Sequence, residues 1–392
     1  MKILYVSMDN MSSQKGSTIH IKETIDNLEK RGHSVTLLAQ STAPVNNINR
    51  FHRTGSFLHH KSELKQFLGL LGVCFRTSLY ILRFRKDNDI IYTRDLFAAV
   101  LAILFRKKTK NKVVYEINGI WQEERKLKGN YLLNNLYICL ISRIEKMFIG
   151  KADKLIAVSK GIKEWLEDNY GFRDNEISVV SNGVNIGLFR PVEDKRILLE
   201  QIGNSDIRVT DRIVCYIGRL TFWQGVQYLA EAAPDVVKAV PDTKFLIVGD
   251  GWQKQELEQR IAELGVSRNF IFTGLIPYEK VPVYINLADI CVAPFTYERN
   301  QKTGLSPLKI YSYMACRKPI ITSRMPGLEF LEKYDCGILL KPGHIKDLSV
   351  SIINLLGDRH RRTELSRNGY LYATRECGWE KTAEKIEKII LK

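Results

Sequence analysis

The sequence predicts an α/β protein built from two doubly wound parallel sheets. Short apolar stretches of strand length alternate with stretches of helical periodicity along nearly the whole chain. This alternation indicates βαβ units and parallel strands. A chain of 392 residues is too long for one hydrophobic core, so we expect two domains. The turn-rich run at residues 181–185 interrupts the alternation near the middle and indicates the boundary between them.

The first half contains six apolar stretches that we interpret as strands, at residues 2–7, 34–38, 89–93, 112–116, 154–158 and 177–180. Helical periodicity predicts helices between them, at residues 18–31, 64–84, 96–106, 132–149 and 159–167. Residues 40–62 are expected to be an irregular insert, and residues 120–130 a charged loop. The first βαβ unit lacks the G-x-G-x-x-G pattern of a dinucleotide site.

The second half repeats the alternation with six further predicted strands, at residues 213–217, 244–248, 269–273, 290–293, 319–321 and 338–340. Helices are expected at residues 225–238, 251–264, 278–287 and 345–356, with another that begins at Leu308. Residues 294–307 are expected to form a polar loop, and a basic helical tail ends the chain.

Ligands of doubly wound sheets bind beyond the carboxyl ends of the strands. The loop at residues 294–307 is suited to an anion, because the first turn of the helix after it has unpaired N–H groups and a positive dipole end. Lys309 lies in that turn and opposes the dipole unless it faces an anion. From these residues alone, an ordinary connection with a solvated lysine is an equal alternative. Small residues follow the other strands, at Gly16, Asn118-Gly119, Gly218, Gly249, Gly274 and Gly304.

The charge and cysteine content limit the compartment and the partners. Seven scattered cysteines without metal-ligand spacing favour reduced thiols in a cytoplasmic protein. No signal peptide and no apolar run of about 20 residues is visible, so we expect a soluble protein, at most peripheral to a membrane.

The net charge of +16 calls for an anionic partner. Basic runs at residues 83–86 and 106–110 flank apolar helices, which suits an anionic membrane surface; core helices with solvated basic ends are the alternative. Nucleic acid is the less favoured partner, since zinc-finger spacing and an RNP-like aromatic pattern are both missing from the sequence.

Several short motifs then carry a resemblance to a known family. The motifs are Ile-Ser-Val-Val-Ser-Asn-Gly-Val-Asn (177–185), Tyr-Ile-Gly-Arg-Leu (216–220), Phe-Leu-Ile-Val-Gly-Asp-Gly (245–251), Ile-Phe-Thr-Gly (271–274) and Ser-Pro-Leu-Lys-Ile-Tyr-Ser-Tyr-Met-Ala-Cys-Arg-Lys-Pro (306–319). In this order and spacing they resemble the retaining glycosyltransferases of the GT-B fold, in family 4. The N-terminal half resembles the family more loosely, through the Gly16 loop, residues 32–35 and residues 156–159.

The resemblance implies two Rossmann-like domains that face each other across a cleft. We expect an acceptor-binding domain at residues 1–185 and a nucleotide-sugar-binding domain at 186–375. A helix at 376–392 is then expected to pack back on the first domain. The implied activity is hexose transfer from a nucleotide diphosphate sugar, with a UDP-sugar favoured over a GDP-sugar, to a polysaccharide or lipid-linked acceptor in cell-envelope biosynthesis. The resemblance also implies retention at the anomeric carbon, no cofactor or metal, and a place at the inner face of the plasma membrane.

The resemblance also assigns roles to residues of this chain. Arg219 and Lys309 are expected to stabilise the leaving diphosphate, a task that suits a guanidinium fork. His20 is a third catalytic candidate, although a lone histidine is more often structural. The remaining donor-binding candidates are Gly16, Gly218, Gln224, Gly249, Gly274, Leu275, Glu298, Gly304, Leu305, Ser306 and Ser312. Lys15, Asn118 and Gly119, with His20, are expected on the acceptor side.

Two departures from the family pattern raise an alternative. The paired glutamates of the family fall on Gly304 and Ser312, and a serine offers the nucleotide ribose only one weak hydrogen bond. Gln224 stands where many members have a phosphate-binding lysine. A non-catalytic GT-B protein that binds a nucleotide or a partner is therefore the first alternative, and a nucleic-acid-binding protein the second.

Overall fold

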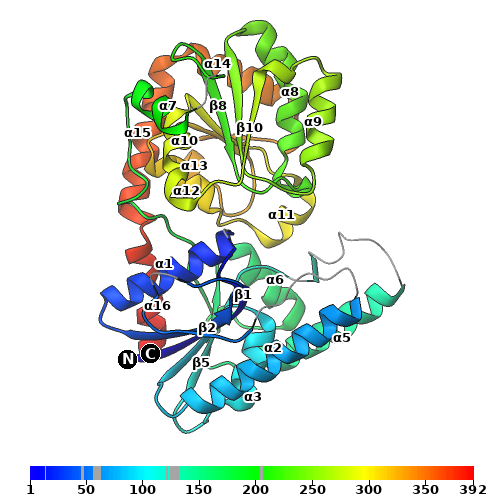
Figure 1. The fold of residues 1–392 in the computed structure, drawn as a ribbon, viewed down its shortest axis with the longest axis vertical. Helices are drawn as coiled ribbons and strands as arrows, with labels where there is room; N and C mark the ends of the chain where they lie inside the picture. The colour runs from blue at the N-terminus through cyan, green and yellow to red at the C-terminus, as the bar shows by residue number, and fades with distance from the viewer. Residues whose placement is uncertain (14, 46–47, 56–62, 121, 124–131, 204–205) are drawn as a thin grey trace. The chain divides into compact units, whose positions relative to one another are not determined.

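The computed structural model describes residues 1–13, 15–45, 48–55, 63–120, 122–123, 132–203 and 206–392, with the side chains of 63–67, 132–138 and 299 left out. Contacts within the chain divide it into two compact units (Figure 1). The N-terminal unit comprises Met1–Asn182 together with Trp379–Lys392, and the C-terminal unit comprises Gly183–Gly378. The chain therefore crosses between the units twice.

The N-terminal unit is built on a parallel sheet with the strand order β3-β2-β1-β4-β5-β6-β7. The strands are β1 (Lys2–Asn10), β2 (Ser34–Gln40), β3 (Phe51–Arg53), β4 (Ile90–Thr93), β5 (Lys112–Ile117), β6 (Lys154–Ala157) and β7 (Ile177–Val179). The chain winds outward from β1 in one direction and from β4 in the other, which makes the edge between them the switch point of this sheet.

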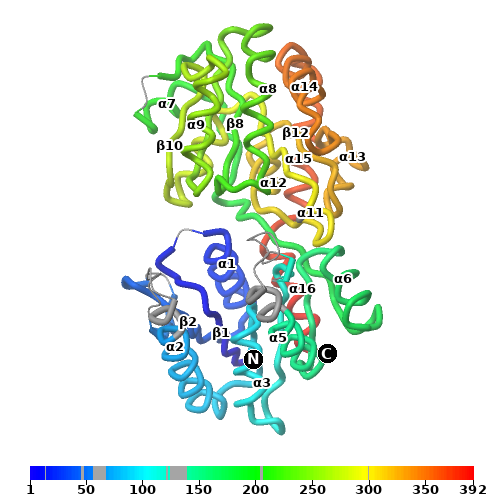
Figure 2. Tube along the Cα trace, turned by 90° about the vertical axis from the view of Figure 1, so that its right-hand side faces the viewer, coloured from blue at the N-terminus to red at the C-terminus, as the bar shows by residue number. Residues whose placement is uncertain are grey.

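Helices cover both faces of this sheet (Figures 1 and 2). They are α1 (Gly16–Lys30), α2 (Glu63–Phe84), α3 (Leu96–Phe105), α5 (Leu132–Ile149), α6 (Lys160–Tyr170) and α16 (Trp379–Leu391). The last helix of the chain, α16, packs against α1, and on the other side α3 packs between α2 and α5. Because α16 belongs to this unit, the end of the chain contributes Ala383, Ile386 and Ile390 to its core.

The C-terminal unit has a second parallel sheet, with the order β10-β9-β8-β11-β12-β13. Its strands are β8 (Arg212–Ile217), β9 (Thr243–Val248), β10 (Phe270–Gly274), β11 (Ile290–Ala293), β12 (Ile320–Ser323) and β13 (Ile338–Leu340). Here β8 and β11 are neighbours, while the chain runs outward through β9 and β10 on one side and through β12 and β13 on the other. The switch point therefore lies between β8 and β11.

The helices of this unit alternate with its strands. They are α7 (Lys195–Ile202), α8 (Val226–Ala239), α9 (Lys254–Glu263), α10 (Val281–Leu287), α11 (Tyr297–Thr303), α12 (Leu308–Ala315), α13 (Phe330–Lys333), α14 (Ile345–Gly357) and α15 (Arg359–Glu376), with short 3₁₀ turns η1 (Phe222–Gln224), η2 (Ser267–Asn269) and η3 (Tyr278–Lys280). Both faces of the central strands are buried, as in Val214 and Cys215 of β8, because helices cover each side. The prediction of two doubly wound parallel sheets is confirmed.

Two local predictions were wrong. The insert at residues 40–62 contains the short edge strand β3, whose Phe51 pairs with Leu37; three residues are too few to show a strand period. The expected loop at 294–307 contains α11, which has no apolar periodicity and is held by Asn300 instead. The Asn300 amide donates to the carbonyls of Trp223 and Thr296, at 2.9 Å each. The charged loop at 120–130 lies mostly outside the described residues.

In the part of the chain that the structure describes, no helix is both long and apolar enough to cross a membrane.

Candidate functional site

The loops that follow β8 and β11 meet at the switch point of the C-terminal sheet. Asn300 of α11 donates to the carbonyl of Trp223 in η1, and the Thr296 amide donates to the same carbonyl at 3.3 Å. Helix α12 begins directly after these loops, at Leu308. The switch point therefore brings the predicted residues 218–224 and 304–312 of two distant segments into one place.

Lys309, in the first turn of α12, is the central cation of the site at this switch point. Its Nζ donates to Gln224 Oε1 at 2.7 Å. It also lies 4.1 Å from the ring centroid of Tyr216 and 5.3 Å from that of Phe295. Burial lowers the pKa of Lys309 to about 7. Within the described residues no carboxylate pairs with Lys309, so the ammonium has aromatic faces and one amide around it but no counter-charge.

The neighbouring backbone leaves no room for side chains at two glycines. A Cβ on Gly225, at φ +78°, would lie 1.7 Å from the carbonyl oxygen of Pro294. A Cβ on Gly249, at φ +133°, would lie 2.0 Å from the carbonyl oxygen of Gly218. Glycine is therefore required at both positions by conformation and by close approach. The Gly249 amide also donates to the Gly274 carbonyl at 3.0 Å, so the ends of β8, β9 and β10 converge on the site.

Arg219 is the exposed cation beside this site. It follows β8, and its carbonyl accepts a hydrogen bond from the Tyr216 hydroxyl at 2.8 Å. Its guanidinium is exposed, and among the described residues no hydrogen bond or ion pair holds it. The site thus has one enclosed ammonium and one accessible guanidinium, both without a carboxylate.

The residues before α12 differ in what they can offer a ligand. The Leu305 amide already donates to the Pro326 carbonyl at 2.8 Å, so it can bind a phosphate only if that bond breaks. The Ser306 hydroxyl lies 3.2 Å from that of Tyr311. Gly304 adopts φ 59° and ψ 177°. The Leu308 and Lys309 amides at the start of α12 remain the better anion donors, since helix geometry leaves them without internal acceptors, whereas the Ile310 amide donates to the Pro307 carbonyl at 3.1 Å.

The two positions where the family has paired glutamates, Gly304 and Ser312, carry no carboxylate in this chain. The buried Ser312 hydroxyl donates back to the Leu308 carbonyl at 2.9 Å. Glu298 is exposed on α11; burial, and after it the negative charge of Glu298, raises the pKa of Tyr228, so this carboxylate lies toward α8. Leu275 is exposed after β10.

In the N-terminal unit, the predicted residue His20 is part of a buried polar cluster. It is 4% exposed. Its Nδ1 lies 2.7 Å from Asn182 Oδ1 and its Nε2 lies 2.8 Å from Glu116 Oε1, while the edge of its ring meets Trp379. Both ring nitrogens therefore face partners of the same unit, and the geometry supports a positioning role more directly than proton transfer.

Glu116 is the residue that the sequence interpretation missed. Burial alone would raise its pKa, but the His20 charge, the hydrogen bond from His20 and the Arg94 charge outweigh burial and lower it to about 2. The Asn118 amide donates to Glu116 Oε1 at 2.8 Å, and the Tyr92 hydroxyl donates to Oε2. A glutamate inside the largely apolar strand β5 (Lys112–Ile117) was the available signal, because buried carboxylates need partners.

The other predicted residues of this unit lie at the start of α1 and after β5. Lys15 is the N-cap residue of α1, and its amide donates to Thr18 Oγ1 at 3.2 Å; Gly16 begins the helix. Buried Arg94 ties this turn down, donating to Asp9 and to the Ser17 carbonyl at 2.9 Å each. Asn118 and Gly119 follow β5, whose carboxyl end carries Glu116.

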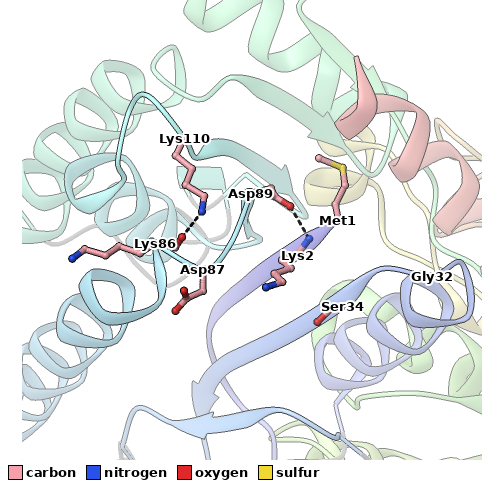
Figure 3. A pocket seen from close by; sticks show the side chains of 8 residues that line it. All are labelled: Met1, Lys2, Gly32, Ser34, Lys86, Asp87, Asp89 and Lys110. Atoms are coloured by element: carbon pink, nitrogen blue, oxygen red, sulfur yellow. Dashed lines mark hydrogen bonds between the residues drawn. The ribbon is translucent and has the colours of Figure 1, made fainter.

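A further hollow, of about 460 Å³, lies at the opposite, amino ends of β1, β2 and β4 (Figure 3). Three lysines and two aspartates lie on its wall, and the Lys2 amide donates to Asp89 at 2.9 Å. None of the predicted site residues lines it. Its mixed charges and its position away from the carboxyl ends make it a poor candidate for the ligand site.

Comparison with known proteins identifies two family models that together span most of the chain. The model "Glycosyltransferase Family 4" matches residues 15–188, and "Glycosyl transferases group 1" matches residues 199–372. An uncharacterised glycosyltransferase of Methanocaldococcus jannaschii is 25% identical over 312 residues, which are 78% of this chain and 76% of the relative.

Solved structures give the same picture for the fold. Sucrose-phosphate synthase of Thermosynechococcus elongatus matches with a TM-score of 0.80 at 20% identity, covering 100% of this chain and 98% of the other. HepE of Anabaena, solved in complex with UDP-glucose, matches with a TM-score of 0.74 at 19% identity, covering 100% and 99%. Both show that the two sheets have the GT-B arrangement of strands and helices.

The buried pair of His20 and Glu116 leads to a stability prediction. We expect Glu116→Gln to lower the free energy of unfolding by about 3 kcal/mol, because it removes the buried carboxylate that lies 2.8 Å from His20 Nε2 and accepts hydrogen bonds from Tyr92 and Asn118. The pKa of Glu116 is below its ordinary value of 4.5, so this stabilisation is complete above about pH 4.5 and is lost as pH falls toward 2. Urea unfolding at pH 7 and pH 3 measures both effects.

The matched control is Glu164→Gln, which removes the exposed i,i+4 partner of Lys160. Its effect should stay near 0.5 kcal/mol or less. Equal destabilisation by the two substitutions would contradict a structural role for the Glu116 pair.

Proposed function

Because the chain belongs to the group 1 and family 4 glycosyltransferases of the GT-B fold, we propose that it transfers a hexose from a nucleotide diphosphate sugar to a polysaccharide or lipid-linked acceptor. The proposed donor is a UDP-sugar, with a GDP-sugar as the second choice, and the proposed outcome is retention at the anomeric carbon. HepE, which shares the fold, was solved with UDP and with UDP-glucose, and this supports the choice of UDP.

The observation that carries the proposal is the uncompensated pair of cations at the switch point. Lys309 is half-buried without a carboxylate partner among the described residues, and Arg219 is exposed beside it. A buried cation is costly unless an anion joins it. A diphosphate at the carboxyl ends of β8 and β11 would supply that anion, and the amides of the first α12 turn add hydrogen bonds in the same direction.

Lys309 and Arg219 also suit the bond that breaks in the proposed reaction, which joins C1 of the sugar to the diphosphate oxygen. Departure of the nucleoside diphosphate from C1 leaves an oxocarbenium-like sugar and moves negative charge onto the leaving oxygen. Lys309, Arg219 and the helix dipole stabilise that charge, so the proposed reaction needs no metal. Retention follows when the acceptor hydroxyl attacks from the face that the diphosphate leaves, with a diphosphate oxygen accepting its proton.

Gln224 has a defined part in this arrangement. Its Oε1 accepts a hydrogen bond from Lys309, which leaves its Nε2 as a donor for a phosphate oxygen. The charge that other members place here is lost, but the amide orients the neighbouring ammonium. We propose Leu275 and Gly274 for contact with the base, and His20 for positioning on the acceptor side rather than for proton transfer.

Loss of Arg219 tests catalysis directly. We expect Arg219→Ala to lower kcat for transfer or hydrolysis of the donor by 10²- to 10³-fold, the range found when one donor to a developing oxyanion is removed. Arg196→Ala, which removes another exposed arginine of the same unit, should leave the rate unchanged. The assay is release of UDP from UDP-hexoses, with anomeric NMR of the product for retention. Equal background rates for wild type and Arg219→Ala would favour the non-catalytic alternative.

The pKa of Lys309 predicts how donor affinity depends on pH. Free Lys309 has a pKa of about 7, lowered by burial, and a bound diphosphate favours its protonated form. The Kd for UDP should therefore rise with pH above about 7, by up to tenfold per unit. Lys309→Met should bind more weakly and show no such slope. The measurement is titration calorimetry from pH 6.5 to 9; parallel curves for the two proteins would contradict the assignment.

Restoring a carboxylate at position 312 tests the departure from the family pattern. We expect Ser312→Glu to bind UDP about tenfold more tightly, since a hydrogen bond from the ribose to a charged acceptor contributes about 1.5–3 kcal/mol. Ser312→Gln has the same length without the charge and should gain much less. Because Ser312 is buried, thermal unfolding of both variants must be compared first. Equal gains for Glu and Gln would contradict a missing ribose carboxylate.

A further inference from the structure

Helix α2 carries large apolar side chains on two opposite faces. Val73 and Ile81 point into the N-terminal unit and are buried. On the outer side, spacings of three, four and four residues align a row that is between 49% and 65% exposed: Leu68, Leu71, Phe75 and Leu79. An ordinary surface helix is polar on its outer face. A continuous exposed apolar row is instead typical of a docking surface.

Cations outnumber carboxylates in the sequence around this row. Residues 64–86 and 96–112, which contain α3 and all of α2 after Glu63, have no aspartate or glutamate, and Glu63, Asp87, Asp89 and Asp95 border these ranges. They do contain ten cations: Lys65, Arg76, Arg83, Arg85, Lys86, Arg106, Lys107, Lys108, Lys110 and Lys112. Helices α2 and α3 pack side by side, as Figures 1 and 2 both show. The apolar row and the basic segments therefore belong to one part of the N-terminal unit.

We propose that this surface, which we define as the outer row Leu68–Leu79 of α2 with Arg76, Arg83, Lys107 and Lys108, docks on an anionic lipid bilayer. All four cations are exposed. An amphipathic helix with apolar side chains and flanking cations lies in the plane of a membrane interface, with its apolar side among the acyl chains. The cations then face anionic head groups, and each one raises the affinity about fivefold.

The cations around the apolar row make a second copy of the chain a less favourable partner than an anionic bilayer. A second copy of the chain would bring its own cations against those of the first, and like charges across an interface are unfavourable. Docking does not depend on the proposed function. If that function holds, docking places the unit where lipid-linked acceptors are found, and this last step rests on it.

The test is sedimentation of the full-length protein with vesicles of phosphatidylcholine alone and with 30% phosphatidylglycerol. Wild type should bind the anionic vesicles, bind neutral vesicles at least tenfold more weakly, and be released by 0.5 M NaCl. Phe75→Ser/Leu79→Ser should lose at least tenfold in affinity, because the apolar anchor is removed. Lys107→Gln/Lys108→Gln should lose about 25-fold.

Matched controls lie in the C-terminal unit. Leu371→Ser removes an exposed leucine of α15, and Lys238→Gln/Lys280→Gln removes two exposed lysines; both should bind vesicles like wild type. UDP affinity should be unchanged in all four variants, which separates failure of docking from failure of the proposed function. Equal binding to neutral vesicles, or wild-type binding by Phe75→Ser/Leu79→Ser, would overturn the proposal. If wild type bound no vesicles but formed a dimer, and Phe75→Ser/Leu79→Ser were monomeric, the row would be assigned to contact with a second copy of the chain.

Discussion

The C-terminal unit is organised around one half-buried lysine ammonium that has no counter-charge among the described residues. Lys309 is held by the Gln224 amide and the faces of Tyr216 and Phe295, and burial moves its pKa to about 7. Hydrogen bonds and aromatic faces offset only part of the cost of removing a cation from water. The structure tolerates that cost at the point where two parallel strands diverge and a helix begins. An anion that binds there interacts with the ammonium, with the loops at the diverging strands and with the start of the helix. An ordinary strand–loop–helix connection lacks the unpaired ammonium, and this distinguishes a binding site from it.

In the N-terminal unit, by contrast, the buried charged groups have partners of opposite charge. Glu116 faces His20 at 2.8 Å and Arg94 pairs with Asp9, while Asn182, Asn118 and Tyr92 complete the cluster. This cluster joins the start of α1, the ends of β4 and β5, and the segment at which the chain leaves the unit. Paired buried charges of this kind fix geometry and offer a ligand less charge than an unpaired group does. The two units therefore divide the physical tasks, one offering an open electrostatic site and the other a rigid polar support.

The sequence was sufficient for the sheets, because buried parallel strands such as Ile213–Ile217 are continuous apolar runs, and most helices have clear periodicity. It also located Lys309 in the first turn of its helix. It did not reveal that the Leu305 amide is occupied by Pro326 or that Ser312 bonds back to Leu308, since both depend on backbone geometry. Glu116 was missed because strand position alone does not show which buried side chains meet. The polar helix α11 was missed because tertiary contacts of Asn300, rather than amphipathicity, hold it.

Proton uptake on binding of UDP at pH 8 tests the central claim most directly. At that pH, about nine-tenths of free Lys309 is neutral if its pKa is about 7, while the UDP phosphates are already ionised. Calorimetry in two buffers of different ionisation enthalpy should give an uptake of nearly one proton per UDP bound by wild type, and none by Lys309→Met. Equal uptake by both proteins, or none by either with tight binding, would contradict a diphosphate resting against Lys309.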